Sequence, residues 1–229
     1  MAEEALPDGV LPYPLPPWEH QFKTLSVFCR AEEARIARFI PAPLRLVSDV
    51  LQITVMRFDS TVPARPYFDS AVIAHVAYGD TTGGYWAFGY TSTDEVLSGT
   101  REIWGYRMKL AERMVLAEGE GRISGFTERL GTRVIALDMR VTGKRFEVPD
   151  TFPRLYLKTI PHADRPAAAL TTVVAMDYDA DLSVNLTGEG TVRLEGSAQD
   201  PLDDLGPLDV IGASFVAGHQ ILPWGREIG

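Results

Sequence analysis

The chain has 229 residues, of which 45% are hydrophobic and 23% charged, and its formal net charge is −9. The hydrophobic fraction supports a sizeable core and excludes a disordered chain. The acidic balance argues against a nucleic-acid binder, which needs clustered positive charge. The length suits one large β-rich domain. The single cysteine, Cys29, leaves no internal disulfide and favours a cytoplasmic location.

The first 20 residues are predicted to form an extended arm ahead of a single domain over residues 21–229. Five prolines lie between Pro7 and Pro17, and proline fixes φ and removes a backbone donor, which disfavours a helix. Acids without a basic start mean that we expect no signal peptide. No run reaches about 18 apolar residues, so we expect no membrane span and no membrane partner.

The first elements of the domain are a predicted strand over 24–30 and a predicted helix over 31–40. Alternating apolar residues mark the strand. Glu32 and Glu33 stand in the first helical turn, where the helix dipole favours anions. Pro41 ends the helix.

Beyond residue 46 the hydrophobic pattern has a period of two, which is typical of strands. The strands are separated by turn signals, and we interpret Gly83-Gly84 and Gly188-Glu189-Gly190 as two of the turns. Many strands between turns predict a mainly β, antiparallel sandwich or barrel with few helices.

No motif for a nucleotide or a metal is present. The sequence lacks GxGxxG, the P-loop pattern, HExxH and clustered cysteines. Four histidines lie far apart in sequence without ligand spacing: His20, His75, His162 and His219. We therefore expect no metal and no cofactor.

Three segments carry more specific sequence. Residues 101–111 read REIWGYRMKLA, residues 157–162 read LKTIPH, and the C-terminal region contains PLDDL at 201–205, VIGASF at 210–215 and ILP at 221–223. These segments, with PAPL at 41–44, resemble the acetoacetate decarboxylase family, whose central motif reads RE-x-x-x-[FY]-P-K-K-L. The matches run in order from about residue 22 to residue 228, so the resemblance spans nearly the whole chain.

The resemblance implies a cone-shaped antiparallel β-barrel of the α+β type with a few short helices. It also implies an interior pocket for a small-molecule substrate and a homo-oligomer. Decarboxylases of this family form a Schiff base between a lysine and a β-keto acid, and the iminium accepts electrons as CO₂ leaves. That lysine must be neutral to attack, and acetoacetate decarboxylase is a known example of such activation by a neighbouring cation.

The chain departs from the family at the reactive position itself. The family's Pro-Lys-Lys is replaced by Arg107-Met108-Lys109, so the position of the Schiff-base lysine holds a thioether that cannot form an imine. Lys109 keeps the tuning position, and neighbouring side chains in an extended segment point to opposite sides. The family's two active-site glutamates correspond approximately to Ile53 and Asp69.

Three hypotheses follow. The first is an enzyme without a Schiff base that cyclises, dehydrates or isomerises a polyketide-like or keto-acid intermediate in natural-product biosynthesis, with Asp69 and Tyr106 as acid/base groups. The second is a carbon–carbon lyase in which Lys109 is the amine. The third is a non-catalytic binding protein with a degenerate pocket. The candidate catalytic residues are therefore Asp69, Tyr106 and Lys109, and the candidate substrate-binding residues are Glu102, Trp104, Arg107 and Met108.

Charge is distributed unevenly along the chain. Residues 101–145 carry a net charge of +4, whereas residues 177–209 carry −8. The segment that contains the reactive position is thus locally basic in an acidic protein. Such a segment suits an enolate or a carboxylate ligand.

Overall fold

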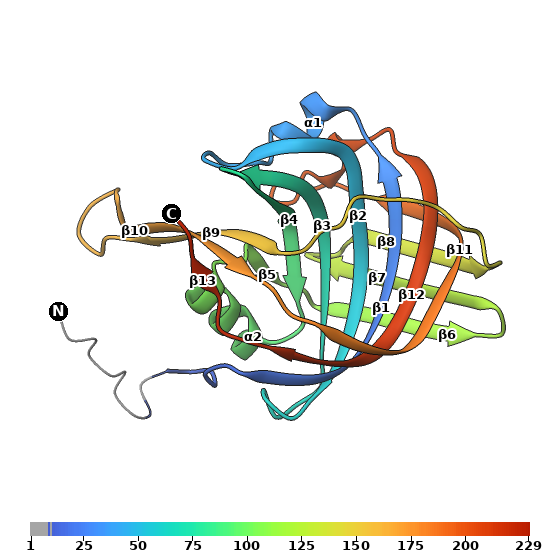
Figure 1. Ribbon diagram of the computed structural model, residues 1–229, viewed down its shortest axis with the longest axis horizontal. Helices are drawn as coiled ribbons and strands as arrows, with labels where there is room; N and C mark the ends of the chain where they lie inside the picture. The colour runs from blue at the N-terminus through green and yellow to red at the C-terminus, as the bar shows by residue number, and fades with distance from the viewer. Residues whose placement is uncertain (1–8, 10) are drawn as a thin grey trace.

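The computed structural model describes residue 9 and residues 11–229, and the chain is mainly β-sheet with a few short helices (Figure 1). The strands are β1 (Trp18–Arg30), β2 (Arg45–Ser60), β3 (Tyr67–Tyr78), β4 (Thr81–Thr91), β5 (Met108–Leu110), β6 (Arg113–Gly119), β7 (Arg122–Arg129), β8 (Thr132–Val141), β9 (Arg154–Pro161), β10 (Ala168–Met176), β11 (Ala180–Leu194), β12 (Asp209–Leu222) and β13 (Arg226–Glu227). The helices are α1 (Glu33–Ala37), α2 (Asp94–Gly99), the π-helical turn η1 (Thr100–Trp104) and the 3-10 turn η2 (Leu202–Leu205).

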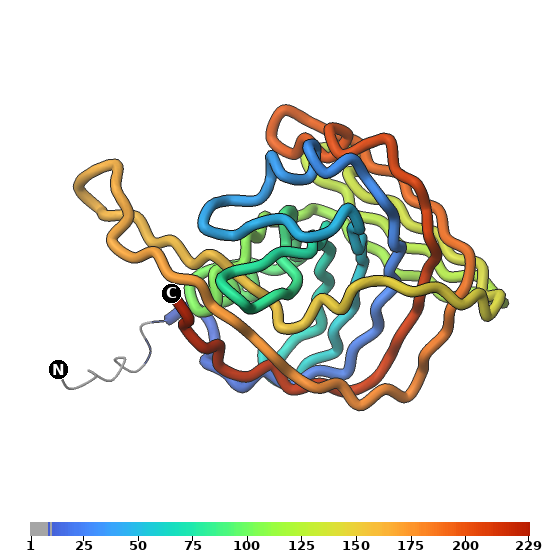
Figure 2. Tube along the Cα trace, turned by 45° about the horizontal axis from the view of Figure 1, so that its top comes forward, coloured from blue at the N-terminus to red at the C-terminus, as the bar shows by residue number. Residues whose placement is uncertain are grey.

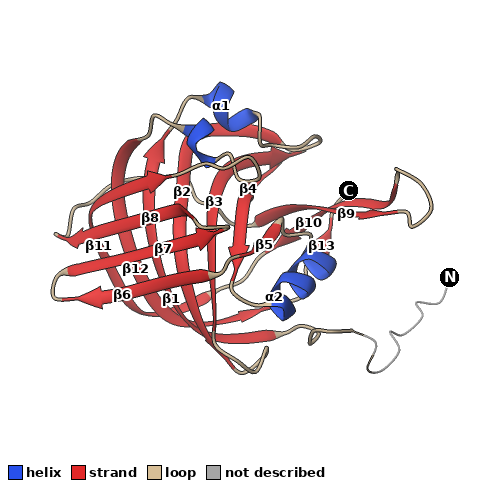
Figure 3. Ribbon diagram, turned by 180° about the vertical axis from the view of Figure 1, so that it is seen from behind, coloured by secondary structure: helices blue, strands red, loops and turns tan. Residues whose placement is uncertain are grey.

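All described strands belong to one sheet, in the order β13-β10-β9-β4-β3-β2-β1-β12-β11-β8-β7-β6, with β5 added to β4. The pairs are antiparallel except for β4 with β5 and β4 with β9. Figure 2 shows the trace curling round on itself, as the right-handed twist of a many-stranded sheet requires. The helices lie at the periphery, as the view from behind shows (Figure 3).

The curled sheet has a core on each face, because successive strand residues point to opposite sides. The first, the main core, contains residues such as Leu25, Val27 and Ile53. The second, which we call the aromatic core, lies between β1–β4 and the elements that cover them, α2, η1, β5, β9 and β10. Its buried members are Trp18, Phe22, Met56, Phe58, Tyr67, Ala71, Ile73, Trp86, Val96, Trp104, Tyr106, Met108, Tyr156, Val174, Met176 and Leu222.

Several predicted boundaries were wrong. The helix predicted over 31–40 is only the five-residue α1, because its last residues form a turn that leads into β2. The arm predicted over 1–20 ends earlier, since β1 begins at Trp18 and pairs there with β12. Residues 1–8 and 10 of that arm lie outside the described residues.

The two predicted glycine turns lie inside strands. Gly83 and Gly84 belong to β4, and residues 188–190 are part of the continuous β11. A Cβ on Gly84 would lie 2.7 Å from the Thr151 carbonyl oxygen, and one on Gly190 would lie 2.8 Å from the Cβ of Ala213. Glycine at these positions therefore allows another segment to approach the strand closely, and it does not mark a turn.

Within the described residues, no helix is long and apolar enough to cross a lipid bilayer.

Candidate functional site

A cleft opens where the sheet is nearly interrupted between β4 and β9. These strands share a single backbone pair, Gly84 with Arg154, and β5 pairs with the far end of β4 for three residues only. The cleft has a volume of about 650 Å³ and is lined by β4, β9 and the segment from Gly105 to Lys109. Its lining includes four main-core residues of β4, Tyr85, Ala87, Phe88 and Tyr90, together with Tyr106 and Met108, which belong to the aromatic core.

The backbone that carries the central motif turns at Gly105. The η1 turn ends there with a φ of 89°, in the left-handed region that glycine tolerates. A Cβ on Gly105 would lie 2.6 Å from the Cα of Lys158 on β9. Both the conformation and the space therefore require glycine, and this turn sets the position of β5 between β4 and β9.

Met108 and Lys109 point to opposite faces because β5 is extended. Met108 is 2% exposed and packs in the aromatic core. On β4, a Cβ built on Gly89 would lie 2.7 Å from the Met108 sulfur, so the glycine makes room for this side chain. Lys109 pairs in register with Tyr90 of the main core.

The Lys109 amine pairs with the buried carboxylate of Asp200. Its Nζ lies 2.7 Å from Oδ1 of Asp200, and Arg129 Nε lies 3.1 Å from Oδ2. The Tyr90 hydroxyl donates to the same carboxylate at 3.0 Å. Burial acts to raise the pKa of Asp200, but Lys109, Tyr90 and Arg129 together lower it below its ordinary value. The carboxylate is therefore ionised, and Lys109 serves as one of its two cations.

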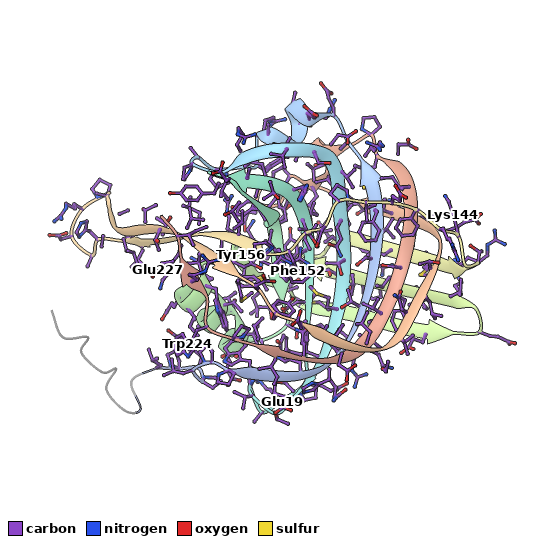
Figure 4. The ribbon with its side chains drawn as sticks, in the orientation of Figure 1. Glu19, Lys144, Phe152, Tyr156, Trp224 and Glu227 are labelled. Atoms are coloured by element: carbon purple, nitrogen blue, oxygen red, sulfur yellow. The ribbon has the colours of Figure 1, made fainter. Side chains whose placement is uncertain are left out.

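Aromatic rings surround Met108 on the other face. The rings of Tyr106 and Tyr156 stack with centroids 3.8 Å apart, and Trp86 meets Tyr106 edge-on at 4.9 Å. Tyr156, on β9, is labelled in Figure 4. Burial raises the pKa of both tyrosines well above the ordinary value. Their hydroxyls therefore stay protonated and remain able to donate hydrogen bonds.

Asp69 is the acid of this aromatic face. It is 5% exposed, on β3, and pairs across the sheet with Met56 on one side and Thr91 on the other. Burial raises the pKa of the Asp69 carboxyl to about 7, while the Thr91 hydroxyl acts weakly in the opposite direction. A carboxyl with this pKa exchanges a proton readily near neutral pH, which is the property of a general acid or base.

Six buried polar side-chain atoms on the aromatic face have no hydrogen-bond partner among the described residues. They are His20 Nδ1, Thr54 Oγ1, Asp69 Oδ1, Trp86 Nε1, Thr91 Oγ1 and Tyr156 OH. Cross-strand pairing places the Asp69 and Thr91 side chains on the same face. Buried polar atoms in native proteins almost always have partners. Their concentration on this face makes it the candidate site for a ligand with both donors and acceptors.

A histidine–tyrosine pair extends the polar face. His20 Nε2 and the Tyr67 hydroxyl lie 2.8 Å apart, and both side chains are buried. Burial lowers the pKa of His20 to about 4, so the ring is neutral at physiological pH. When the neutral ring accepts the Tyr67 proton at Nε2, it carries its own proton at Nδ1. The His20 Nδ1–H group is then a hydrogen-bond donor that faces the site.

The structure brings together Asp69, Trp104, Tyr106 and Met108 on the aromatic face and places Glu102, Arg107 and Lys109 elsewhere. Trp104 is fully buried, and its indole N–H donates to a backbone carbonyl at 3.1 Å. Arg107 lies exposed in the lining of the cleft. Glu102 accepts a hydrogen bond of 2.6 Å from Tyr13 in the N-terminal arm.

The two positions that the family pattern matches to active-site glutamates do not share a face of the sheet. Ile53 belongs to the main core, on the face opposite to Asp69. The strand register instead pairs Asp69 with Met56, which lies in the aromatic core. The sequence analysis also missed four residues of this face, His20, Tyr67, Arg154 and Tyr156. Each occurs in an ordinary alternating strand pattern, and only the register reveals which strand positions share a face.

Comparison with known proteins agrees with this architecture. Residues 7–225 match the family model described as acetoacetate decarboxylase. The chain is 24% identical over 212 residues to an acetoacetate decarboxylase of Burkholderia ambifaria, covering 89% of this chain and 85% of that protein.

Solved structures share the fold. The acetoacetate decarboxylase of Legionella pneumophila superposes with a TM-score of 0.88 at 20% identity, covering 100% of this chain and 93% of that one. The enduracididine biosynthesis enzyme MppR complexed with pyruvate superposes with a TM-score of 0.81 at 17% identity, covering 96% and 93%.

The curled sheet and its buried site therefore define a protein of the acetoacetate decarboxylase-like superfamily, whose members include enzymes of the decarboxylase and lyase type. The match to the family model covers almost the entire length of the chain, and this chain belongs to the acetoacetate decarboxylase family.

Proposed function

We propose that the chain is an enzyme that transfers protons on a keto-acid or polyketide-like intermediate in natural-product biosynthesis, without a Schiff base. The overall outcome is a cyclisation, a dehydration or an isomerisation. One observation carries the proposal. A buried carboxyl with a pKa near 7, Asp69, shares the aromatic face with Met108, which stands where the family places its reactive lysine.

Imine chemistry has no amine at the family's reactive position. Met108 offers only a thioether, and the Lys109 amine is bound to buried Asp200 on the other side of the sheet. To reach the aromatic core, Lys109 would have to leave that carboxylate and turn its side chain to the opposite face of β5. Withdrawing Lys109 would leave Asp200 with Arg129 and Tyr90 as its partners and would cost about 1–3 kcal/mol.

Proton transfer next to a carbonyl needs a base and a group that stabilises the enolate. The Asp69 carboxylate accepts the proton from the carbon, and the electron pair of the broken C–H bond moves onto the carbonyl oxygen. The free N–H of Trp86 and the free hydroxyl of Tyr156 are neutral donors suited to that oxygen. Protonated Asp69 then returns the proton to carbon, or delivers it to a β-hydroxyl that leaves as water.

The proposal is tested by hydrogen–deuterium exchange, which does not require the natural substrate. Pyruvate, 2-oxobutanoate and other keto acids are incubated with the protein in D₂O. Loss of the signal of the C3 protons, which are next to the keto group, is followed by NMR. The wild type and Lys109→Ala should accelerate exchange, and Asp69→Asn should lose about 10²–10⁴-fold of that acceleration. Unchanged exchange in Asp69→Asn would refute the role of Asp69.

The two other hypotheses give different results in the same experiment. A lyase that uses Lys109 would lose its exchange in Lys109→Ala, because an iminium on that residue is what would acidify the C3 protons of the keto acid. A binding protein with a degenerate pocket would bind keto acids in a titration and exchange none of them. Either result would overturn the proposal.

A further inference from the structure

Arg154 is a buried arginine without an acidic partner. Within the described residues, six arginines have no carboxylate within 4 Å: Arg45, Arg101, Arg107, Arg145, Arg154 and Arg226. The other five are exposed, whereas Arg154 is 7% exposed. A charge buried without a counter-charge is costly. The free-energy cost of this burial therefore has to be explained at Arg154, whereas the five exposed arginines are solvated.

The position of Arg154 follows from the junction between β4 and β9. Arg154 pairs with Gly84 of β4, and a Cβ on that glycine would lie 2.5 Å from Arg154 Nη1. Its other neighbour in the sheet is Met176 of β10, a member of the aromatic core, so the Arg154 side chain lies on the aromatic face. The only strand pair that bridges this junction thus brings a guanidinium to the site.

The contacts of Arg154 leave most of its donors free. Nη1 donates to the Thr151 carbonyl at 3.1 Å, and the guanidinium lies over the Phe152 ring, 4.5 Å from its centroid. Phe152 is labelled in Figure 4. A guanidinium carries five N–H donors in a fork that matches a carboxylate. Among the described residues, this carbonyl is the only acceptor that meets strict hydrogen-bond geometry, and the Tyr178 hydroxyl also lies close enough to the guanidinium to interact with it.

Arg154 and Asp69 lie on the same face of the sheet. The pKa of Tyr178 is raised chiefly by burial, is lowered by the Arg154 charge and is raised further by the Asp69 charge. The same two charges act in the same directions on Tyr106. Tyr106 and Tyr178 therefore lie within the electric field of both groups, so the Arg154 cation and the Asp69 carboxyl act on the same two rings.

We propose that Arg154 binds the carboxylate of the substrate, so that the site selects keto acids over neutral ketones, esters and amides. The Tyr178 hydroxyl, next to the guanidinium, completes the carboxylate site. This assignment rests on the proposed function only in that the bound keto acid lies beside Asp69. The Arg154 guanidinium pairs with the substrate carboxylate. Asp69 acts on the carbon chain that is attached to that carboxylate.

Binding measurements test the assignment separately from catalysis. Pyruvate is titrated into the full-length protein by calorimetry, and methyl pyruvate is titrated as the neutral analogue. The wild type should bind pyruvate at least 10-fold more tightly than the ester. Arg154→Met should weaken pyruvate binding by about 10- to 100-fold, the effect of losing hydrogen bonds to a charged group, and should leave ester binding unchanged. Arg154→Lys should give an intermediate loss.

Controls separate this inference from the proposed function. Arg226→Met removes an exposed arginine that also has no acidic partner, and pyruvate binding should stay within 3-fold of the wild type. Asp69→Asn should keep pyruvate binding while losing proton exchange, so a failure of catalysis leaves the binding result intact. Equal affinity of the wild type for pyruvate and its ester would overturn the assignment even if Arg154→Met fails to fold. Unchanged binding in folded Arg154→Met would also overturn it.

Discussion

Met108 and Lys109 are neighbours in β5, yet they belong to opposite faces of the sheet. The Met108 side chain packs among the rings of the aromatic core, while the Lys109 amine lies 2.7 Å from Asp200 Oδ1. The chain has therefore kept a lysine from the family's lysine pair and given it a structural role. This separation underlies the expectation that the site works without an imine.

The Asp200 cluster should matter for stability more than for activity. Asp200→Asn leaves Arg129 and Lys109 without their shared carboxylate and should lower the free energy of unfolding by about 3–5 kcal/mol. Lys109→Ala should cost less, about 1–3 kcal/mol, because Asp200 retains Arg129 and Tyr90. Urea denaturation measures both changes. A larger loss in Lys109→Ala than in Asp200→Asn would contradict this hierarchy.

Asp69 should make the protein less stable as the pH rises. Burial raises the pKa of Asp69 from 3.8 to about 7, so between these values the folded state binds a proton that the unfolded state has released. The free energy of unfolding then falls by about 1.4 kcal/mol for each pH unit. Between pH 5 and pH 7 this amounts to about 2–3 kcal/mol.

Asp69→Asn should remove that dependence, because the amide does not titrate. The difference in unfolding free energy between Asp69→Asn and the wild type should grow in favour of the variant from pH 5 to pH 7, and should level off above about pH 7. Denaturation curves at matched pH values measure it. Parallel pH profiles for the two proteins would show that Asp69 has an ordinary pKa.

Gly105→Ala should destabilise the protein and impair the site together. A left-handed conformation costs a non-glycine residue about 1–2 kcal/mol, and the added Cβ would also clash with the Lys158 backbone. Gly143→Ala is the matched control, because that glycine has a φ of 70° and no atom within 4 Å of an added Cβ. Thermal unfolding should show a larger loss for Gly105→Ala. Equal losses would mean that the contact with β9 is unimportant.

The sequence predicted the fold better than it predicted the site. Period-two alternation and the family landmarks indicated a mainly β chain with few helices, because burial of one strand face leaves a strong pattern. The same pattern cannot say how a strand is registered against its neighbours. For this reason the sequence could not show that Ile53 and Asp69 lie on opposite faces, or that Met56 is the β2 residue beside Asp69.

Glycine was a second source of error. Gly83, Gly84 and Gly190 looked like turn residues, but they allow close approach of another segment to a strand. The junction of β4 with β9 depends on one such glycine, and the position of Arg154 depends on that junction. Contacts between residues some 70 positions apart leave no local signal, so Arg154 and Tyr156 could not be recognised before the sheet was assembled.

The most direct test of the central claim is borohydride trapping of an imine with pyruvate, followed by peptide mass spectrometry. The wild type and Lys109→Ala should form no adduct, because position 108 carries a thioether in place of the amine. Met108→Lys should form one on residue 108, where burial lowers the pKa of a lysine and keeps it nucleophilic. An adduct on Lys109 of the wild type would contradict the account, and so would a folded Met108→Lys variant that forms no adduct.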